Sequence, residues 1–165
     1  MKPIILLDVN GVLNPELEPD GEARNPSPHL SDLKIALVRR LATKGRIAWV
    51  STSPPDVIDG LEAQLGLEAK PLRVTVEPEP GDADQQTPKL APVVRWLKNM
   101  EAQGDTDWDA IVWIDDELGT DVHDWAHQYP RPVLLEKPHC GEGLTEAHVV
   151  AVQVFLNNED RDTAS

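Results

Sequence analysis

Short apolar runs alternate along the chain with segments in which apolar residues recur every three or four positions. The runs are bounded by charged or turn-forming residues, as expected for strands that are buried on both faces of a parallel sheet. Such runs occupy residues 4–7, 46–51, 72–76, 111–114 and 132–136. The pattern therefore predicts five short strands separated by longer connections.

The segments with the longer repeat are typical of amphipathic helices, and their ends carry residues that start and stop helices. Ser31 has the residue type of an N-cap, and Gly45 that of a stop, for the first helix. Pro54 and Pro55 open a second helix that ends at Gly66. Three further helices are predicted to begin at Lys89, to cover 121–127 and to follow Thr145 as a cap.

Strands that alternate with helices need crossover connections, which indicates a parallel sheet with helices on both faces. We expect a doubly wound, three-layer α/β/α sandwich around a mainly parallel five-stranded sheet. The chain has 165 residues, of which 40% are hydrophobic, enough for one core and too few for two. Residues 1–157 are therefore predicted to form one domain, followed by a polar tail at 158–165.

Acidic residues outnumber basic residues by 29 to 15, and the formal net charge is −14. This balance argues against nucleic acid or an anionic membrane as a partner bound mainly by electrostatic attraction. Such binding would need a local cluster of basic residues. Cys140 is the single cysteine, so no internal disulfide can form. With no secretory h-region at the start and no run near the roughly 20 apolar residues of a membrane span, we expect a cytoplasmic protein without membrane contact.

Polar side chains that can bind a metal or take part in catalysis follow the predicted strands, at the edge where ligands bind in such sheets. They are Asp8 and Asn10 after the first strand, Ser51 or Thr52 after the second, and Asp115 and Asp116 after the fourth, while Lys89 begins the preceding helix. Three carboxylates at one dry spot are costly unless a divalent cation and a lysine compensate them. Oxygen ligands with few other donors indicate Mg²⁺.

The segment that begins Asp8-Val9-Asn10-Gly11 resembles the first motif, Asp-x-Asp-Gly, of the haloacid dehalogenase (HAD) superfamily. The other three motifs of that family follow in order: Ser51 resembles the second, Lys89 the third, and Asp115-Asp116 the fourth. The resemblance covers about residues 3 to 136 and implies a HAD-like Rossmannoid fold. It also implies a Mg²⁺-dependent phosphatase, a phosphoric monoester hydrolase that forms an aspartyl-phosphate.

The resemblance assigns a role to each motif residue. Asp8 is the nucleophile, and the phosphate group is bound by Ser51 or Thr52, Lys89 and the backbone amides around Asn10 and Gly11. The metal is held by an Asp8 oxygen, the carbonyl of Asn10 and one of Asp115 and Asp116. Which Asp of the pair ligates the metal directly, and whether Ser51 or Thr52 contacts the phosphate, stay open at this point.

Asn10 departs from the family pattern because a second aspartate usually protonates the leaving oxygen and later activates water at this position. An amide can do neither, and loss of a general acid/base typically costs about 10² to 10⁴ in rate. We therefore expect a slow phosphatase. Asn10 is either natural in an enzyme that tolerates it, the mark of a catalytically impaired homologue that binds a phosphorylated ligand or protein, or an introduced substitution.

The intervals between the motifs are too short for a sizeable cap domain. Capless members of the superfamily generally expose the site to larger substrates, such as phosphoproteins or nucleic-acid ends, or borrow a lid from a neighbouring subunit. The acidic loop at 16–25 would repel polyanions. We expect a phosphorylated substrate of unspecified identity, do not expect nucleic acid, and regard a homo-oligomer as compatible with the sequence.

Overall fold

The sheet at the centre of the fold is parallel throughout. A computed structural model of the chain describes residues 2–9, 11–13, 30–74, 76, 86–139 and 142–163. Within these residues the strands are β1 (Pro3–Leu7), β2 (Arg46–Trp49), β3 (Leu72–Arg73), β4 (Ala110–Ile114) and β5 (Val133–Glu136). They form one five-stranded sheet in the order β3-β2-β1-β4-β5, and every neighbouring pair is parallel. The predicted α/β fold class is confirmed.

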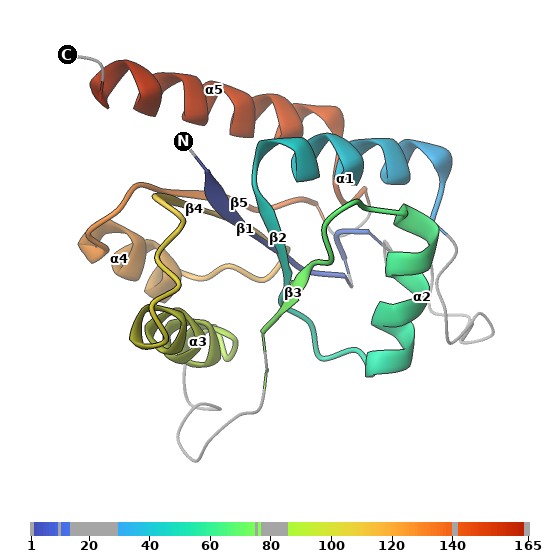
Figure 1. The fold of residues 1–165 in the computed structure, drawn as a ribbon, viewed down its shortest axis with the longest axis horizontal. Coiled ribbons are helices and arrows are strands. Elements are labelled where there is room, and N and C mark those ends of the chain that lie inside the picture. The colour runs from blue at the N-terminus through green and yellow to red at the C-terminus, as the bar shows by residue number, and fades with distance from the viewer. Residues whose placement is uncertain are drawn as a thin grey trace.

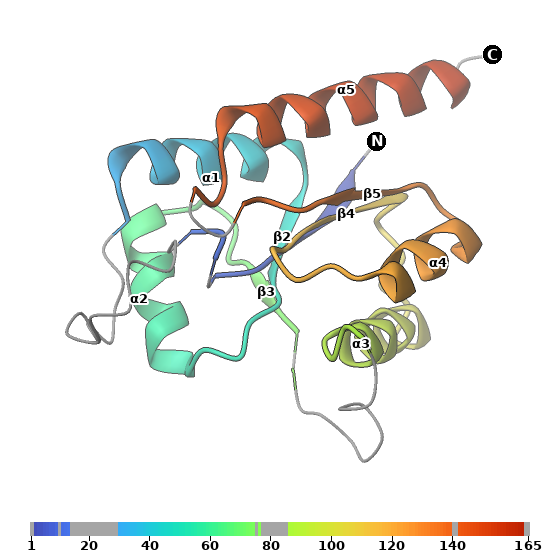
Figure 2. The same cartoon turned by 180° about the vertical axis from the view of Figure 1, so that it is seen from behind.

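Helices cover both faces of this sheet (Figures 1 and 2). They are α1 (Asp32–Lys44), α2 (Pro55–Leu65), α3 (Leu90–Ala102), α4 (Thr120–Gln128) and α5 (Glu146–Thr163). Side chains of α1, α2 and α5 pack into one hydrophobic cluster, and side chains of α3 and α4 pack into a second cluster on the other face. The chain therefore forms the predicted three-layer α/β/α sandwich.

Strand β1 occupies the middle of the sheet, and all five of its residues are buried. Ile5 and Leu7 point into the cluster beneath α1, α2 and α5, whereas Ile4 and Leu6 point into the opposite cluster. Because both faces of the sheet are covered, the strand is apolar at every position instead of alternating.

The three central strands end at the same level. Leu7 is in register with Trp49 of β2 and with Ile114 of β4. The backbone N–H of Asp8 donates to the carbonyl of Ile114 at 3.1 Å, and the N–H of Val50 donates to the carbonyl of Leu7 at 3.0 Å. The residues that follow β1, β2 and β4 consequently meet along one edge of the sheet.

The helix end signals in the sequence have the predicted structural roles. The Ser31 hydroxyl accepts from the backbone N–H of Lys34 at 3.2 Å and caps α1, and Gly45 follows its last residue. Gly66 ends α2 in the left-handed region with φ 58°, which a residue without a Cβ adopts readily.

Two element ends differ from the predictions. Strand β3 covers two residues instead of the five predicted at 72–76, of which residue 75 lies outside the described part. The last helix, α5, continues through Thr163 and so includes part of the segment 158–165, which stays a predicted polar tail. Once a helix has formed, each added residue gains one backbone hydrogen bond, which favours its extension. Among the helices in the described part of the chain, none has the length and apolar character needed to cross a membrane.

Two leucines of α1 test the packing of this helix. Leu41 has no exposed surface, whereas Leu33 is 62% exposed. We expect Leu41→Ala to lower the free energy of unfolding by about 2–5 kcal/mol, since it removes buried methyl groups and leaves a cavity. Leu33→Ala is the matched control and should change it by less than about 0.5 kcal/mol. Urea denaturation measures both values, and equal losses would contradict the described packing of α1.

Candidate active site

One lysine joins two buried carboxylates at the carboxyl edge of the sheet. Lys89 Nζ lies 3.0 Å from Oδ1 of Asp8 and 3.1 Å from Oδ2 of Asp115. Asp8 is 2% exposed and Asp115 is 0% exposed, and the Lys89 side chain is only 12% exposed. The second contact on each carboxylate is a backbone amide: Val9 N–H donates to Asp8 at 2.8 Å, and Glu117 N–H donates to Asp115 at 2.9 Å.

A third carboxylate, that of Asp116, lies against the turn that follows β1. A Cβ added to Gly11 would lie 2.2 Å from Oδ2 of Asp116, so a larger residue would displace this carboxylate from its position. Gly11 also has φ +80°, a conformation that side chains rarely tolerate. The turn and the half-buried Asp116 are therefore fitted to each other at the place where the motif of residues 8–11 predicts a phosphate site.

Burial and mutual repulsion shift the ionisation of these groups. Burial raises the pKa of Asp8 to about 7, repulsion from Asp115 adds to this rise, and Lys89 opposes it. Burial alone would lower the pKa of Lys89, but the two carboxylates outweigh it and the pKa is raised. The pKa of Asp116 is also raised, by burial and then by repulsion from Asp115 and Glu117. The group carries more negative charge than Lys89 can neutralise.

This excess of carboxylate oxygens fits a divalent cation. Asp8, Asp115 and Asp116 each offer an oxygen, and these oxygens lie within 4.8 Å of one another. Hard cations such as Mg²⁺ take carboxylate oxygens as ligands and would compensate the charge that raises the pKa of Asp8. The donor set is therefore suited to a metal, and the residue types alone do not select Mg²⁺ over other hard divalent cations.

A hydrogen-bonded tie holds the turn that carries Lys89. Thr87 is 1% exposed, and its hydroxyl donates to Asp121 at 2.7 Å while its backbone N–H donates to the same carboxylate at 2.8 Å. The Thr87 hydroxyl also accepts from the N–H of Gly119 at 2.9 Å. Thr87 and Asp121 thus fasten the start of α3 to the start of α4. Sequence reasoning missed this pair, and the only signal was a threonine two residues before the lysine.

A second set of contacts supports the turn after β1. The N–H of Leu144 donates to the carbonyl of Val12 at 2.7 Å, and Lys34 Nζ donates to the carbonyls of Glu142 and Leu144 at 2.8 and 2.5 Å. The segment before α5 is therefore fastened both to this turn and to α1. Sequence reasoning did not single out these residues.

For the other predicted site residues, the structure does not show a contact that assigns a role to each of them. Ser51 follows β2 at the same edge, is half-buried, and accepts from the N–H of Ser53 at 3.0 Å, whereas Thr52 is exposed. The choice between them as phosphate ligands stays a prediction. Asn10 lies outside the described residues. The structure thus brings together Asp8, Gly11, Lys89, Asp115 and Asp116.

This fold and this grouping of carboxylates with a lysine agree with the haloacid dehalogenase superfamily of hydrolases. The family model for the HAD domain in Swiss Army Knife RNA repair proteins matches residues 4–149, and the chain therefore belongs to this family of HAD domains. Neither a curated protein nor a solved structure matches the chain. The family supports hydrolase activity, and the three aspartates could hold the divalent metal that HAD enzymes generally use.

Metal binding at this group should depend on pH. Because Asp8 must be ionised to hold a cation and its pKa is about 7, we expect apparent Mg²⁺ affinity to be about tenfold weaker at pH 6 than at pH 8. At ten times its Kd, Mg²⁺ should raise the free energy of unfolding by about 1.4 kcal/mol. Thermal unfolding over a Mg²⁺ titration at both pH values measures this, and equal affinities would refute it.

Asp8→Asn is the control for that titration and should abolish the response to Mg²⁺. Without metal, folded Asp8 keeps its proton up to about pH 7, whereas the unfolded chain releases it near the ordinary value of 3.8. The folded state therefore loses stability as pH rises between these values. Without metal, the melting temperature of Asp8→Asn should therefore be higher than that of the original chain. This difference should be larger at pH 8 than at pH 5.

Alanine substitutions at two glycines distinguish the cost of backbone strain from the effect of displacing Asp116. Gly11 and Gly104 have φ +80° and +84°, but a Cβ at Gly104 would meet nothing within 4 Å. Both Gly→Ala variants should lose about 1–2 kcal/mol of stability from the left-handed conformation. Only Gly11→Ala should also lose the response to Mg²⁺, which the same titration detects. A full metal response in Gly11→Ala would show that Asp116 does not belong to the site.

Proposed function

We propose that the protein is a Mg²⁺-dependent phosphohydrolase that cleaves a phosphate monoester through an adduct on Asp8. The observation that carries this proposal is the buried contact of Lys89 Nζ with Asp8 at 3.0 Å and with Asp115 at 3.1 Å. A structural salt bridge would need one carboxylate for one lysine. Three carboxylates beside one lysine leave an excess of negative charge, which a bound cation would neutralise. The group also lies where ligands bind in parallel α/β sheets.

The proposed reaction has two displacements at phosphorus. An oxygen of Asp8 forms a bond to phosphorus while the bond from phosphorus to the ester oxygen breaks, and the alcohol leaves with a proton. Water then attacks the same phosphorus, the bond to Asp8 breaks, and inorganic phosphate leaves. Dividing the reaction in this way replaces one difficult step by two easier ones.

The chain's own residues stabilise the charge that the phosphoryl group carries. Lys89 favours the ionised form of Asp8 and supplies a cation beside the transferring oxygens, and the turn at Gly11 together with Ser51 or Thr52 offers donors to them. Asp8, the carbonyl of Asn10 and one of Asp115 and Asp116 would hold the metal. Bound Mg²⁺ would supply further positive charge toward the phosphoryl oxygens.

Asn10 makes leaving-group departure the weak point of this reaction. Its amide has no proton to give at neutral pH, so the alcohol must take its proton from water. Substrates whose leaving groups are stable as anions depend least on that proton. Phenyl phosphates should therefore turn over faster than alkyl phosphates.

The family's description supports RNA as the substrate class. This HAD domain is described from Swiss Army Knife RNA repair proteins, and a phosphate monoester on RNA is a terminal phosphate. The expectation against nucleic acid rested on a net charge of −14, which is an average over the whole chain. We propose a terminal phosphate of an RNA strand as the substrate.

Position 10 provides the sharpest test of this proposal. Asn10→Asp restores a general acid/base and should raise turnover of p-nitrophenyl phosphate, and of 5′- or 3′-phosphorylated RNA, by about tenfold or more in the presence of Mg²⁺. Release of inorganic phosphate measures the rate. The gain should be larger for RNA than for the phenyl ester, because the RNA oxygen is the poorer leaving group.

Three controls accompany this assay. Asp8→Asn should abolish turnover, Lys89→Met should reduce it by at least about 10²-fold, as removal of one charge-stabilising donor does, and EDTA should stop it. Absence of turnover in both the original chain and Asn10→Asp would refute the phosphohydrolase. If phosphorylated RNA still bound, the alternative of an impaired homologue that binds a phosphorylated ligand would replace it.

A further inference from the structure

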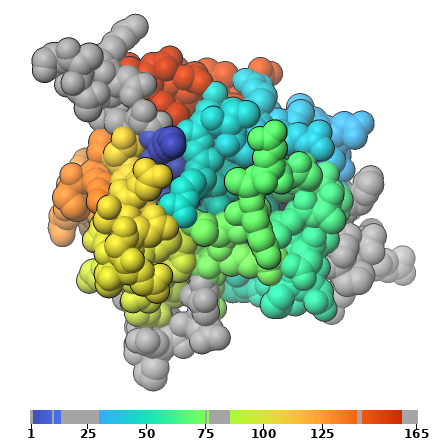
Figure 3. All heavy atoms as spheres, viewed as in Figure 1, coloured from blue at the N-terminus to red at the C-terminus, as the bar shows by residue number. Residues whose placement is uncertain are grey.

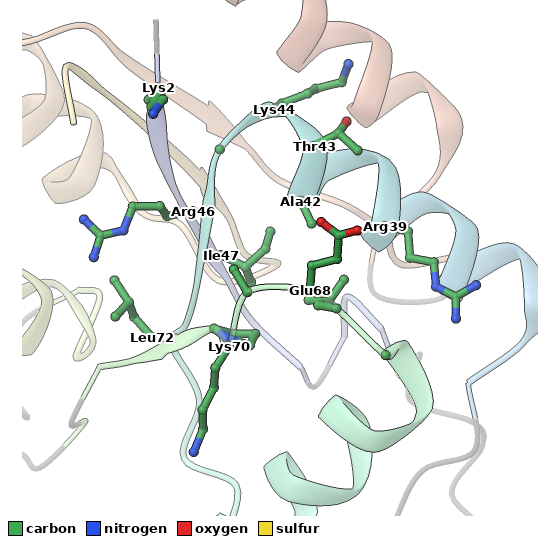
Figure 4. Close-up of a pocket in the computed structure, with 15 residues that line it drawn as sticks. Lys2, Arg39, Ala42, Thr43, Lys44, Arg46, Ile47, Glu68, Lys70 and Leu72 are labelled. Atoms are coloured by element: carbon green, nitrogen blue, oxygen red, sulfur yellow. The ribbon is translucent and has the colours of Figure 1, made fainter. Parts of the chain in front are cut away.

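A hollow of about 780 Å³ lies at the amino-terminal edge of the sheet, at the opposite end from Asp8. Its wall is formed by the residue before β1, the last turns of α1, the start of β2 and the segment that joins α2 to β3. These segments are neighbours on the face of the molecule seen in Figure 3, and Figure 4 shows their side chains. β1 has five residues, so the hollow and the candidate active site are about 15 Å apart along the sheet.

The charge around this hollow is opposite to that of the chain as a whole. Fifteen residues line it, and five of these are basic while one is acidic. The basic residues are Lys2, Arg39, Lys44, Arg46 and Lys70, and the acidic one is Glu68. The whole chain has 15 basic and 29 acidic residues, so a third of its positive side chains surround one hollow. We call this site the basic hollow.

The positive charge is strongest on one side of the basic hollow. On the side of β1, Arg46 is paired with the carboxylate of Asp105 at 2.9 and 3.0 Å, which neutralises it. On the side of α1, Lys44 Nζ donates to the amide oxygen of Gln153, and Arg39 Nε donates to the carbonyl of Leu65 at 2.8 Å. These partners are neutral, so these hydrogen bonds do not neutralise the charge of either side chain.

The arrangement of these cations selects the kind of anion that fits. In Figure 4 the charged ends of Arg39, Lys44 and Lys70 point away from one another, and the carboxylate of Glu68 lies between Ala42 and Arg39. A single phosphate is bound best by donors that converge on one point. Cations spaced around a rim instead match charges spaced along a polymer, as in a nucleic-acid backbone.

We propose that the basic hollow binds the phosphodiester backbone of a single-stranded RNA whose terminal phosphate lies at Asp8. The inference takes the identity of the polyanion from the proposed function, and its charge complementarity from the residues of the hollow. No aromatic side chain is among the fifteen lining residues, so contacts to phosphates and not base stacking account for affinity. Binding is consequently independent of sequence and sensitive to salt.

The distance between the two sites adds a requirement on length. Because helices cover both faces of the sheet, a strand that reaches both sites must pass around the outside of the molecule, along a path longer than the roughly 15 Å that separates the hollow from Asp8. RNA of 15 nucleotides, about 50 Å long at roughly 3.4 Å per phosphate, is long enough for such a path, whereas a dinucleotide uses the site at Asp8 alone.

Charge reversal at one lysine tests the proposal. Lys70 and Lys98 are both exposed, but only Lys70 lines the hollow. In EDTA, which prevents turnover, fluorescence anisotropy with a labelled 15-nucleotide RNA at 50 mM salt should give about five- to tenfold weaker binding for Lys70→Glu. Lys98→Glu, which changes the net charge equally and lies on α3, should bind as the original chain does. Equal losses in the two variants would overturn the proposal.

Removal of the one acidic side chain in the hollow gives a test in the opposite direction. Glu68→Gln should strengthen RNA binding several-fold, whereas Asp124→Asn on α4, with the same change in net charge, should not. A polyglutamate peptide is added as competitor. If it displaces the RNA at equal charge concentration, the partner is an acidic protein surface and the RNA proposal is overturned.

Kinetics separate this proposal from the function proposed above. Lys70→Glu should raise KM for phosphorylated 15-nucleotide RNA about five- to tenfold with kcat unchanged, and should leave turnover of p-nitrophenyl phosphate unaltered. If the chain hydrolyses the phenyl ester but binds RNA no better than Lys70→Glu does, the hollow proposal fails and the phosphohydrolase stands. If RNA binds through Lys70 but no ester is cleaved, the reverse holds.

Discussion

Two carboxylates with almost no exposed surface lie beside each other at Asp8 and Asp115, and Lys89 is the cation that both contact. A buried carboxylate without a partner costs several kcal/mol, so this edge of the fold is arranged around one lysine. The strands β1 and β4 end at the same level and place the two carboxylates, and the lysine is the N-cap residue of α3. Gly11 makes room for a third carboxylate. The shortage of positive charge that remains is what suits the group to a cation.

The components of this group could be predicted from the sequence because each follows or precedes an apolar run. Asp8 and Asp115 end the runs at 4–7 and 111–114, and parallel strands bring their carboxyl ends to one edge. The ends of α1 and α2 were predicted equally well, since Ser31 and Gly66 act through contacts within a few residues. Local signals therefore accounted for most of the fold and for the residues that meet at Asp8.

Contacts between distant segments could not be predicted in the same way. Asp121 holds Thr87 from 34 residues away, and Lys34 reaches carbonyls more than 100 residues further along the chain. Neither residue differs in type from an ordinary surface residue. The basic hollow was hidden for a related reason: its cations are spread from Lys2 to Lys70, and a net charge of −14 averages them away. Only the folded arrangement separates a local potential from the total charge.

The position of β1 in the middle of the sheet has a consequence for synthesis of the chain. Asp8 follows β1, which precedes the other four strands of the sheet along the chain, whereas the neighbouring strand β4 ends at Ile114, about a hundred residues later. At about 5–20 residues per second, the nascent chain carries Asp8 for roughly 5 to 20 seconds before Asp115 exists. During this time β1 has no neighbour on one side. The group of Asp8, Lys89 and Asp115 is therefore complete only after the second half of the sheet has been synthesised.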